Sequence, residues 1–292
     1  MFRNKKQEQR HITSFQIIIL GFLSIVIVGT ILLMLPFATR EGKGASFIDA
    51  LFTATSAVCV TGLVVHDTAT YWSVFGQGVI LLLIQIGGMG IVTVAVAMAS
   101  ISGRKIGLMQ RSTMQEAISA HHIGGIVRLT KFILKTTVII EFVGAVFLMP
   151  VFYKEFGPVK GMWYSLFHSI SAFCNAGFDL IGVKEQFSSL TSYSSGTMLN
   201  ITVIALIVIG GIGFLTWEDI KNNKYHFKRY KMQSKLIIVT TAVLITVPAI
   251  IFMINDMMTG SERMPVFKAL FQSVTLRTAG FNTVDLNAMK QA

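Results

Sequence analysis

The chain has 292 residues, of which 53% are hydrophobic and only 13% are charged. Soluble domains carry about a quarter charged residues, so this composition excludes an ordinary soluble protein and favours a membrane protein. The net charge of +11 lies mainly in residues 1–11, 103–135 and 218–235, which hold 16 of the 25 Lys and Arg residues. Because these basic segments alternate with apolar ones, they indicate cytoplasmic loops that attract inner-leaflet lipid, rather than a nucleic-acid-binding surface.

The first predicted element is a membrane span at 13–37, which follows a basic N-terminal segment. Residues 12–39 contain no charged residue or histidine, and a transmembrane helix needs only about 20 apolar residues. A secretory signal is the alternative, but its apolar region runs only about 7–15 residues. Residues 68–103 are also free of charge, and they contain the second predicted span at 72–101.

Basic and apolar segments continue to alternate after the second span, so we predict an all-α integral membrane fold. Counting crossings from a cytoplasmic N-terminus places both basic linkers inside and every loop at the outer face. The predicted spans are 13–37, 72–101, 136–153, 194–217 and 236–255, and the predicted re-entrant loops are 45–62, 161–178 and 264–281. The chain then divides into a first repeat at 1–102, a linker at 103–135, a second repeat at 136–217, a linker at 218–235 and a partial third repeat at 236–292.

Three short segments of one design identify the re-entrant loops. They read LFTATSAVCVTGL (Leu51–Leu63), LFHSISAFCNAGF (Leu166–Phe178) and LFQSVTLRTAGF (Leu270–Phe281). Each begins with Leu-Phe and passes through small hydroxylated residues to a glycine, with a Phe-to-Gly separation of 10, 10 and 9 residues. One such segment is equally consistent with a tight turn between spans, but three in register favour loops that enter the membrane and return.

A second motif recurs in the span after each of the first two loops. IQIGGMGIVT (Ile84–Thr93) parallels IVIGGIGFLT (Ile207–Thr216), with six of ten positions identical. These glycines resemble a phosphate-binding loop only superficially, because they lie inside apolar spans without a preceding strand or a following lysine. We therefore expect them to allow close approach of the spans to the re-entrant loops, with local bending.

The re-entrant loops have the chemistry of a cation filter. A short helix directs its negative dipole end into the membrane, and the extended residues after it aim backbone carbonyls at the ion in place of water. Glycine suits this position because it adopts positive φ and places no side chain in the ion path. The residues whose carbonyls are predicted to bind the ion are here named the glycine loops: Cys59, Val60, Thr61 and Gly62 in the first, Cys174, Asn175, Ala176 and Gly177 in the second, and Arg277, Thr278, Ala279 and Gly280 in the third.

Charged residues near the glycine loops need separate interpretation. The side chain of Arg277 would repel a cation in the ion path, so we expect it to point behind the filter and to hydrogen-bond a neighbouring loop or a carboxylate. Glu141 lies in the third span beside Lys135, where local pairing or ion binding would account for it. Three acids that follow the glycines are interpreted either as partners of Arg277, as attractors of cations, or as solvated loop residues: Asp67, Asp179 and Asp285.

We expect no catalytic centre and no metal site beyond the transported cation. Cys59 and Cys174 occupy the same position of the internal repeat, so a disulfide is not expected between them. His121 and His122 are adjacent, and adjacent residues of a helix point in different directions. The sequence contains no paired carboxylates, and neither cysteine has a basic partner nearby in sequence, so an enzyme is not expected.

These motifs resemble the Trk/Ktr/HKT superfamily of potassium transporters, and most closely its Ktr-type membrane (pore) subunit. The resemblance covers essentially the whole chain and rests on VCVTGL around Gly62, ISAFCNAGF around Gly177, TLRTAGFNTVD around Gly280 and SGRKIGLMQRSTMQEAI (Ser102–Ile118). It implies helix, pore loop and helix units about a pseudo-fourfold pore, in a multi-pass cell-membrane protein. It also implies a homodimer and a cytosolic nucleotide-binding regulatory ring subunit as partners.

The resemblance further implies potassium uptake through a carbonyl-lined selectivity filter. Glycine at the first filter position accompanies potassium transport and serine accompanies sodium transport, so Gly62 favours K+, with Na+ as a coupling or regulating ion and no cofactor in this chain. The family has four filter loops, whereas this sequence contains three, and we expect the C-terminal part to be missing. The alternative is a membrane scaffold or regulatory subunit without its own conduction pathway.

Overall fold

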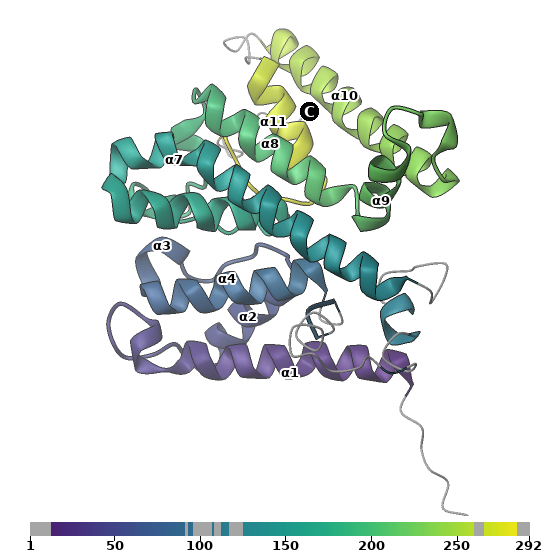
Figure 1. The fold of residues 1–292 in the computed structure, drawn as a ribbon. Coiled ribbons are helices and arrows are strands. Elements are labelled where there is room, and N and C mark those ends of the chain that lie inside the picture. The colour runs from purple at the N-terminus through teal and green to yellow at the C-terminus, as the bar shows by residue number, and fades with distance from the viewer. Residues whose placement is uncertain are drawn as a thin grey trace, which may run out of the picture.

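A computed structural model describes residues 13–90, 93–95, 107, 112–116, 125–259 and 266–284 of the chain. These residues form helices joined by loops and 3₁₀ turns, with no strand among them, and Figure 1 shows successive helices stacked from one end of the molecule to the other. The helices are α1 (Ser14–Met34), α2 (Phe47–Val58), α3 (Thr68–Tyr71), α4 (Val74–Met89), α7 (Ile126–Phe173), α8 (Thr197–Gly211), α9 (Phe214–Asn223), α10 (Met232–Thr259) and α11 (Val266–Thr275), and the 3₁₀ turns are η1 (Pro36–Ala38), η2 (Ile181–Val183), η3 (Thr191–Tyr193) and η4 (Phe227–Arg229).

The first three long elements form one packed unit. α1 begins at a capping box, in which Thr13 accepts from the backbone N–H of Gln16 and the Gln16 side chain accepts from that of Thr13,. α2 begins at Ser46, whose hydroxyl accepts from the N–H of Asp49,. α1 packs against both α2 and α4, so the short helix of the first loop lies between two longer apolar helices.

The third predicted span is the first half of a longer, bent helix. α7 runs for 48 residues and contains both the predicted span at 136–153 and the helix of the second re-entrant loop. It begins at Ile126, inside the segment predicted as a linker, and leaves helical geometry at Gly157, where φ is +77°, just before Pro158,. The chain reverses there, so closely that a Cβ at Gly161 would lie 2.8 Å from the Cα of Tyr153.

The fourth predicted span, at 194–217, contains a sharp bend, as expected from its glycines. α8 ends at Gly211 and α9 begins at Phe214, with a bend of 95° between them. The bend occurs because Gly213 has φ +83°, a backbone conformation that a helix cannot include,. α9 then continues to Asn223, so the first residues of the predicted linker at 218–235 are helical.

The second predicted span also meets a glycine break. Over its described part it is the 16-residue helix α4, which ends at Met89 before Gly90 with φ +80°. Residues 93–95 are helical again, while 91, 92 and 96–101 lie outside the described residues. The third glycine of each GG-x-G motif therefore lies at a helix break, with Gly90 capping the end of α4 and Gly213 capping the beginning of α9, and the 95° bend at Gly213 confirms the expected local bending.

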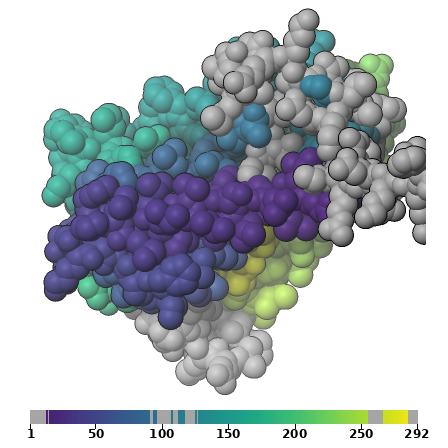
Figure 2. Space-filling view, turned by 90° about the horizontal axis from the view of Figure 1, so that it is seen from below, coloured from purple at the N-terminus to yellow at the C-terminus, as the bar shows by residue number. Residues whose placement is uncertain are grey.

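The surface of the long helices is apolar and open to the surroundings. Within the part of the chain that the structure describes, three helices are long and apolar enough to cross a membrane, Phe15–Met34, Val127–Phe173 and Met232–Ile254, and the bent pair α8 and α9 could form a fourth, broken span. Only 17% of an 18-residue apolar stretch of the first helix is buried, and 11% of such a stretch of the last. Figure 2 shows α1 in purple along one face of the molecule. Among the exposed side chains of α1 are Ile19, Leu23 and Ile31. Such large apolar surfaces are suited to lipid rather than water.

Candidate functional site

Each glycine loop follows a short helix, here named a loop helix. The loop helices are α2, residues 158–173 of α7, and α11. The second and third are anchored by their repeated phenylalanines, since Phe167 is 0% and Phe271 is 1% exposed, whereas Phe52 of the first is 41% exposed. The repeat therefore shares a backbone design, although its apolar anchor is buried in only two of the three copies.

The first two glycine loops also share a turn that the third lacks. After each loop helix the chain makes one left-handed residue, Val60 with φ +56° and Asn175 with φ +58°. The third loop is one residue shorter between Phe and Gly, and among its described residues only Gly280 has positive φ. The shorter spacing in the sequence thus corresponds to the omission of this left-handed residue.

The three glycines of the loops, far apart in sequence, lie side by side. Gly62, Gly177 and Gly280 all have positive φ, between +71° and +74°. A Cβ at Gly62 would lie 2.5 Å from the carbonyl oxygen of Ala176 and 3.4 Å from the Cα of Gly177. In the same way, a Cβ at Gly177 would collide with the carbonyl oxygen of Ala279. Gly62 and Gly177 therefore each abut the backbone of the next loop, where a side chain has no room, whereas a Cβ at Gly280 would lie 3.8 Å from the Cα of Gly177, an ordinary contact.

The side chains of the glycine loops differ in their surroundings. Ala176 and Ala279 are buried, Cys59 is exposed and Cys174 is buried. Thr61 donates a hydrogen bond of 2.9 Å to the hydroxyl of Ser56, while Thr278 is exposed. The side chains share no single chemistry, and the role predicted for these residues belongs to their carbonyl oxygens.

Arg277 points behind the third loop, as expected, but its partner is a hydroxyl. Its Nη2 donates to Thr241 Oγ1 of α10 at 3.2 Å. The predicted acidic partners are engaged elsewhere or lie outside the described residues. Asp67 accepts from the N–H of Thr70 and of Phe187, Asp179 accepts from the N–H of Ile181, and Asp285 is not among the described residues.

Glu141 does not pair with Lys135 as the sequence suggested. The two residues are six positions apart on α7, so they point to different sides of the helix. The buried carboxylate instead accepts hydrogen bonds from Gln85 Nε2 of α4, at 2.8 Å and 3.1 Å. Gln85 was missed from the sequence, because nothing in the local pattern relates a glutamine of one span to a glutamate 56 residues later.

The paired glycines of α4 and α8 allow these helices to touch the loops, which confirms the expected close approach. A Cβ at Gly87 would collide with the carbonyl oxygen of Val58, at the end of the first loop helix. A Cβ at Gly210 would collide with that of Phe173, at the end of the second. The second glycine of the first pair faces the next loop, since a Cβ at Gly88 would lie 2.5 Å from Cys174 Sγ.

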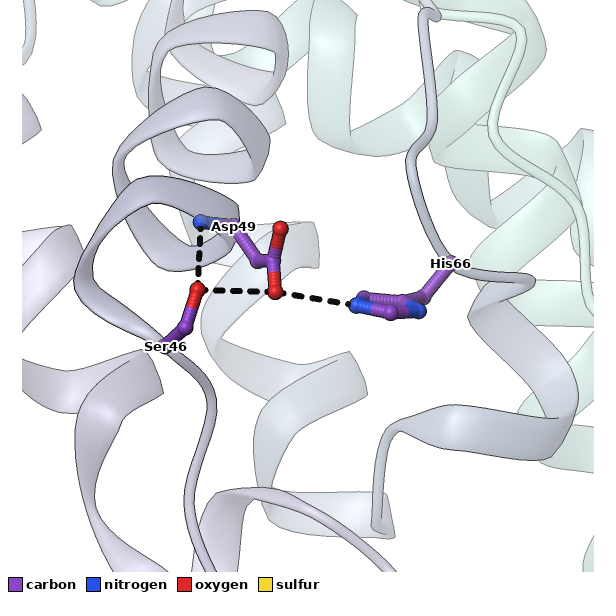
Figure 3. Close-up of polar contacts among 3 residues, drawn as sticks. All are labelled: Ser46, Asp49 and His66. Atoms are coloured by element: carbon purple, nitrogen blue, oxygen red, sulfur yellow. Dashed lines mark hydrogen bonds and ion pairs between the residues drawn. The ribbon is translucent and has the colours of Figure 1, made fainter.

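A polar contact joins the beginning of the first loop helix to the chain that follows the first glycine loop. Figure 3 shows the Asp49 side chain between Ser46 and His66, with Asp49 Oδ2 2.8 Å from Ser46 Oγ and 3.1 Å from His66 Nε2. His66 also stacks on Tyr71, with ring centroids 3.9 Å apart. The hydroxyl of Ser46, and then His66, lower the pKa of Asp49 below its ordinary value of 3.8. This contact closes the loop across 17 residues and has no signal in the sequence.

The lowered pKa of Asp49 predicts a pH dependence. A carboxylate with a depressed folded pKa stabilises the protein above its unfolded pKa, and this contribution is lost as the pH falls through the folded value. We expect the full-length protein to unfold at a higher temperature than its Asp49→Asn variant above pH 3.8 and to lose the difference below it. The effect should be under about 1 kcal/mol, because the contact is partly exposed. Thermal unfolding at several pH values measures it.

Glu41→Gln serves as the matched control, since the ion pair of Glu41 with Lys43 is exposed on the surface. We expect this variant to unfold like the unmodified protein at every pH. A constant difference between Asp49→Asn and the unmodified protein at all pH values would contradict the assignment.

The fold and the converging glycine loops define a multi-pass membrane protein of repeated helix and re-entrant loop units. Residues 1–292 match the family model TrkH, described as cation transport protein, and the chain belongs to this family.

Individual relatives are similar over nearly the whole chain. It is 40% identical to the potassium/sodium uptake protein NtpJ of Enterococcus hirae, over 99% of this chain and 64% of the relative. It is also 40% identical to the Ktr system potassium uptake protein B of Bacillus subtilis, over 94% of this chain and 62% of the relative. The chain thus spans less than two thirds of these proteins.

The crystal structure of the potassium transporter TrkH from Vibrio parahaemolyticus has the same fold. It superposes with a TM-score of 0.66 at 22% identity, over 97% of this chain and 54% of that one.

Proposed function

We propose that the full-length protein containing this chain takes up potassium ions across the cell membrane through a carbonyl-lined selectivity filter. The observation that carries the proposal is the convergence of the three glycine loops, in which Gly62 abuts Ala176 and Gly177 abuts Ala279. Relatives named as potassium uptake proteins, at 40% identity, support the same function. The proposal concerns the full-length protein, because the chain spans only 64% of NtpJ.

The loop helices supply the electrostatics of the proposed filter. Each ends directly before a glycine loop, or one residue earlier for α11, so its negative dipole end lies beside the predicted ion-binding carbonyls,. These carbonyls replace part of the hydration shell of the ion, which is how cation filters select. Transport of this kind contains no chemical step, so an enzymatic activity and a cofactor form no part of the proposal. The transported ion is K+, with Na+ as a coupling or regulating ion.

The remaining parts of the proposal concern the orientation and the partners. Three basic segments, 1–11, 103–135 and 218–235, alternate with apolar ones, which supports a cytoplasmic N-terminus and glycine loops that enter from the outer face. On the cytosolic side, the positive charges of the same segments would bind anionic lipid and a nucleotide-binding regulatory ring subunit. The name of one relative refers to a Ktr system, which supports further components, and the family resemblance favours a homodimer.

Uptake by cells that lack their own potassium uptake systems tests the proposal. Such cells, expressing the full-length protein, should grow at low external K+ and accumulate K+ in preference to Na+. The same cells with an empty vector are the control. Protein present in the membrane without any cation uptake would overturn the proposal and would favour a scaffold or regulatory subunit.

A further inference from the structure

One hydroxyl residue of each loop helix holds the chain on both sides of the loop glycine. The three residues are Ser56, Ser171 and Thr275. Their hydroxyls donate to the carbonyls of the residue after the glycine, Leu63, Phe178 and Phe281, each at 2.7 Å. Their own carbonyls accept from the N–H of the residue before the glycine, Thr61 at 2.9 Å, Ala176 at 2.8 Å and Ala279 at 3.0 Å.

These two hydrogen bonds around the glycine, here named the bracket, form in all three loops although the loops differ. The hydroxyl residue stands six positions before the glycine in the first two loops and five before it in the third. The left-handed residues Val60 and Asn175 occur only in the longer loops, yet the hydroxyl bond has the same length in all three. Loop length and turn type are therefore not what the repeat preserves. It preserves two bonds around the glycine.

The hydroxyl bonds of the second and third loops are buried, where water cannot replace them, and that of the first loop is partly buried. Ser56 is 4%, Ser171 0% and Thr275 3% exposed. A buried carbonyl that loses its donor keeps the full cost of its desolvation, so removal of the hydroxyl leaves the buried carbonyls of Phe178 and Phe281 without a partner,. Rotation of either carbonyl toward a nearby water molecule or ion is then favourable, because it restores a partner.

The bracket also sets the direction of one predicted ion-binding carbonyl in each loop. In a trans peptide unit the N–H and the C=O point in opposite directions. Since the N–H groups of Thr61, Ala176 and Ala279 point to their loop helices, the carbonyls of the same peptide units must point away from them. These carbonyls belong to Val60, Asn175 and Thr278, which are three of the predicted ion-binding residues.

We propose that Ser56, Ser171 and Thr275 are positioning residues of the filter. Their backbone carbonyls turn the carbonyl two residues before the glycine toward the ion, and their hydroxyls hold the carbonyl after the glycine away from it. This inference rests on the proposed function, because it assigns a role within the same site. The positioning residues do not touch the ion. They act through the carbonyl two residues before and the carbonyl one residue after Gly62, Gly177 and Gly280.

Two serines of the second loop helix form a matched pair for the test. Ser171 and Ser169 are both 0% exposed, and Ser169 donates to the carbonyl of Glu141 at 2.6 Å. In the full-length protein we expect Ser171→Ala to lower the K+ over Na+ preference in uptake about tenfold, from the loss of one buried hydrogen bond. The Michaelis constant for K+ should rise, since misaligned carbonyls bind K+ less well. Ser169→Ala should keep the preference, and Ser171→Thr should restore it, because a threonine serves at 275.

The third loop helix offers a second pair, in case Ser171→Ala does not fold. Ser273 donates to the carbonyl of Ile245 at 2.6 Å, and the carbonyl of Leu244, 3.3 Å away, lacks its helical donor because Pro248 has no N–H,. We expect Thr275→Val to lower the K+ preference. Ser273→Ala should lower the stability and leave the K+ preference unchanged. Equal preference in Thr275→Val and Ser273→Ala, or in Ser171→Ala and Ser169→Ala, overturns this inference alone. An unmodified protein that transports no cation overturns the proposed function as well.

Discussion

Gly62→Ser in the full-length protein should reduce the preference for K+ over Na+ about tenfold or more. The new Cβ would lie 2.5 Å from the carbonyl oxygen of Ala176 at a backbone φ of +74°. Left-handed strain and displacement of a packed neighbour each cost on the order of 1–3 kcal/mol, and about 1.4 kcal/mol is a factor of ten in an equilibrium constant. Because the displaced atom is a predicted ion-binding carbonyl, the loss should appear in selectivity. Competitive uptake of K+ and Na+ measures it.

Gly42→Ser separates strain from position. Gly42 has nearly the same backbone conformation, with φ +73°, but a Cβ there would meet nothing within 4 Å. It lies in the loop between η1 and α2, away from the glycine loops. We expect this variant to lose a little stability and no selectivity. Unchanged selectivity in Gly62→Ser, or an equal loss in Gly42→Ser, would refute the assignment of Gly62 to the filter.

Gly210→Ala should separate α8 from the second loop helix. A Cβ at this position would collide with the backbone carbonyl of Phe173, which cannot move away as a flexible side chain could. Overpacking of this kind costs about 1–3 kcal/mol and sometimes more. Phe173 directly precedes the second glycine loop, so we expect lower thermal stability together with loss of uptake. The unfolding temperature of the purified protein and uptake by cells measure the two effects.

The neighbouring glycine provides the control. A Cβ at Gly211 would lie 3.4 Å from Asn175 Nδ2 and 3.8 Å from Arg277 Nη2, which are flexible side-chain atoms at ordinary contact distances. Gly211→Ala should therefore resemble the unmodified protein in stability, although both substitutions replace glycine by a better helix former. Equal stability of the two variants would show that α8 does not need its close approach at Gly210.

Some features followed from composition and repetition alone. Long charge-free segments between basic ones predicted membrane helices, because the bilayer requires apolar side chains and topology follows positive charge. The Leu-Phe to glycine repeat identified all three glycine loops, and the GG-x-G repeat predicted where spans approach them. These signals are local, so each can be read from consecutive residues without knowledge of what lies opposite. The ion-binding role of the loop carbonyls stays a prediction.

Other features depended on directions that a linear pattern does not encode. The 95° bend between α8 and α9 and the reversal of α7 at Gly157 occur inside segments that are apolar throughout, so hydropathy cannot locate them. The buried contact of Gln85 with Glu141 joins separate helices, and its partners are set only by packing.

The glycine loops also combine features set by the sequence with features set by the tertiary structure. Their glycines, hydroxyls and spacing are determined by the sequence, because positive φ and a short turn demand particular residue types. Only the tertiary structure decided that Gly62 meets Ala176, that Gly177 meets Ala279, and that Asp49 reaches His66. Such contacts depend on how each loop helix is seated between its neighbours, and this seating is a property of the assembled helices rather than of any one segment.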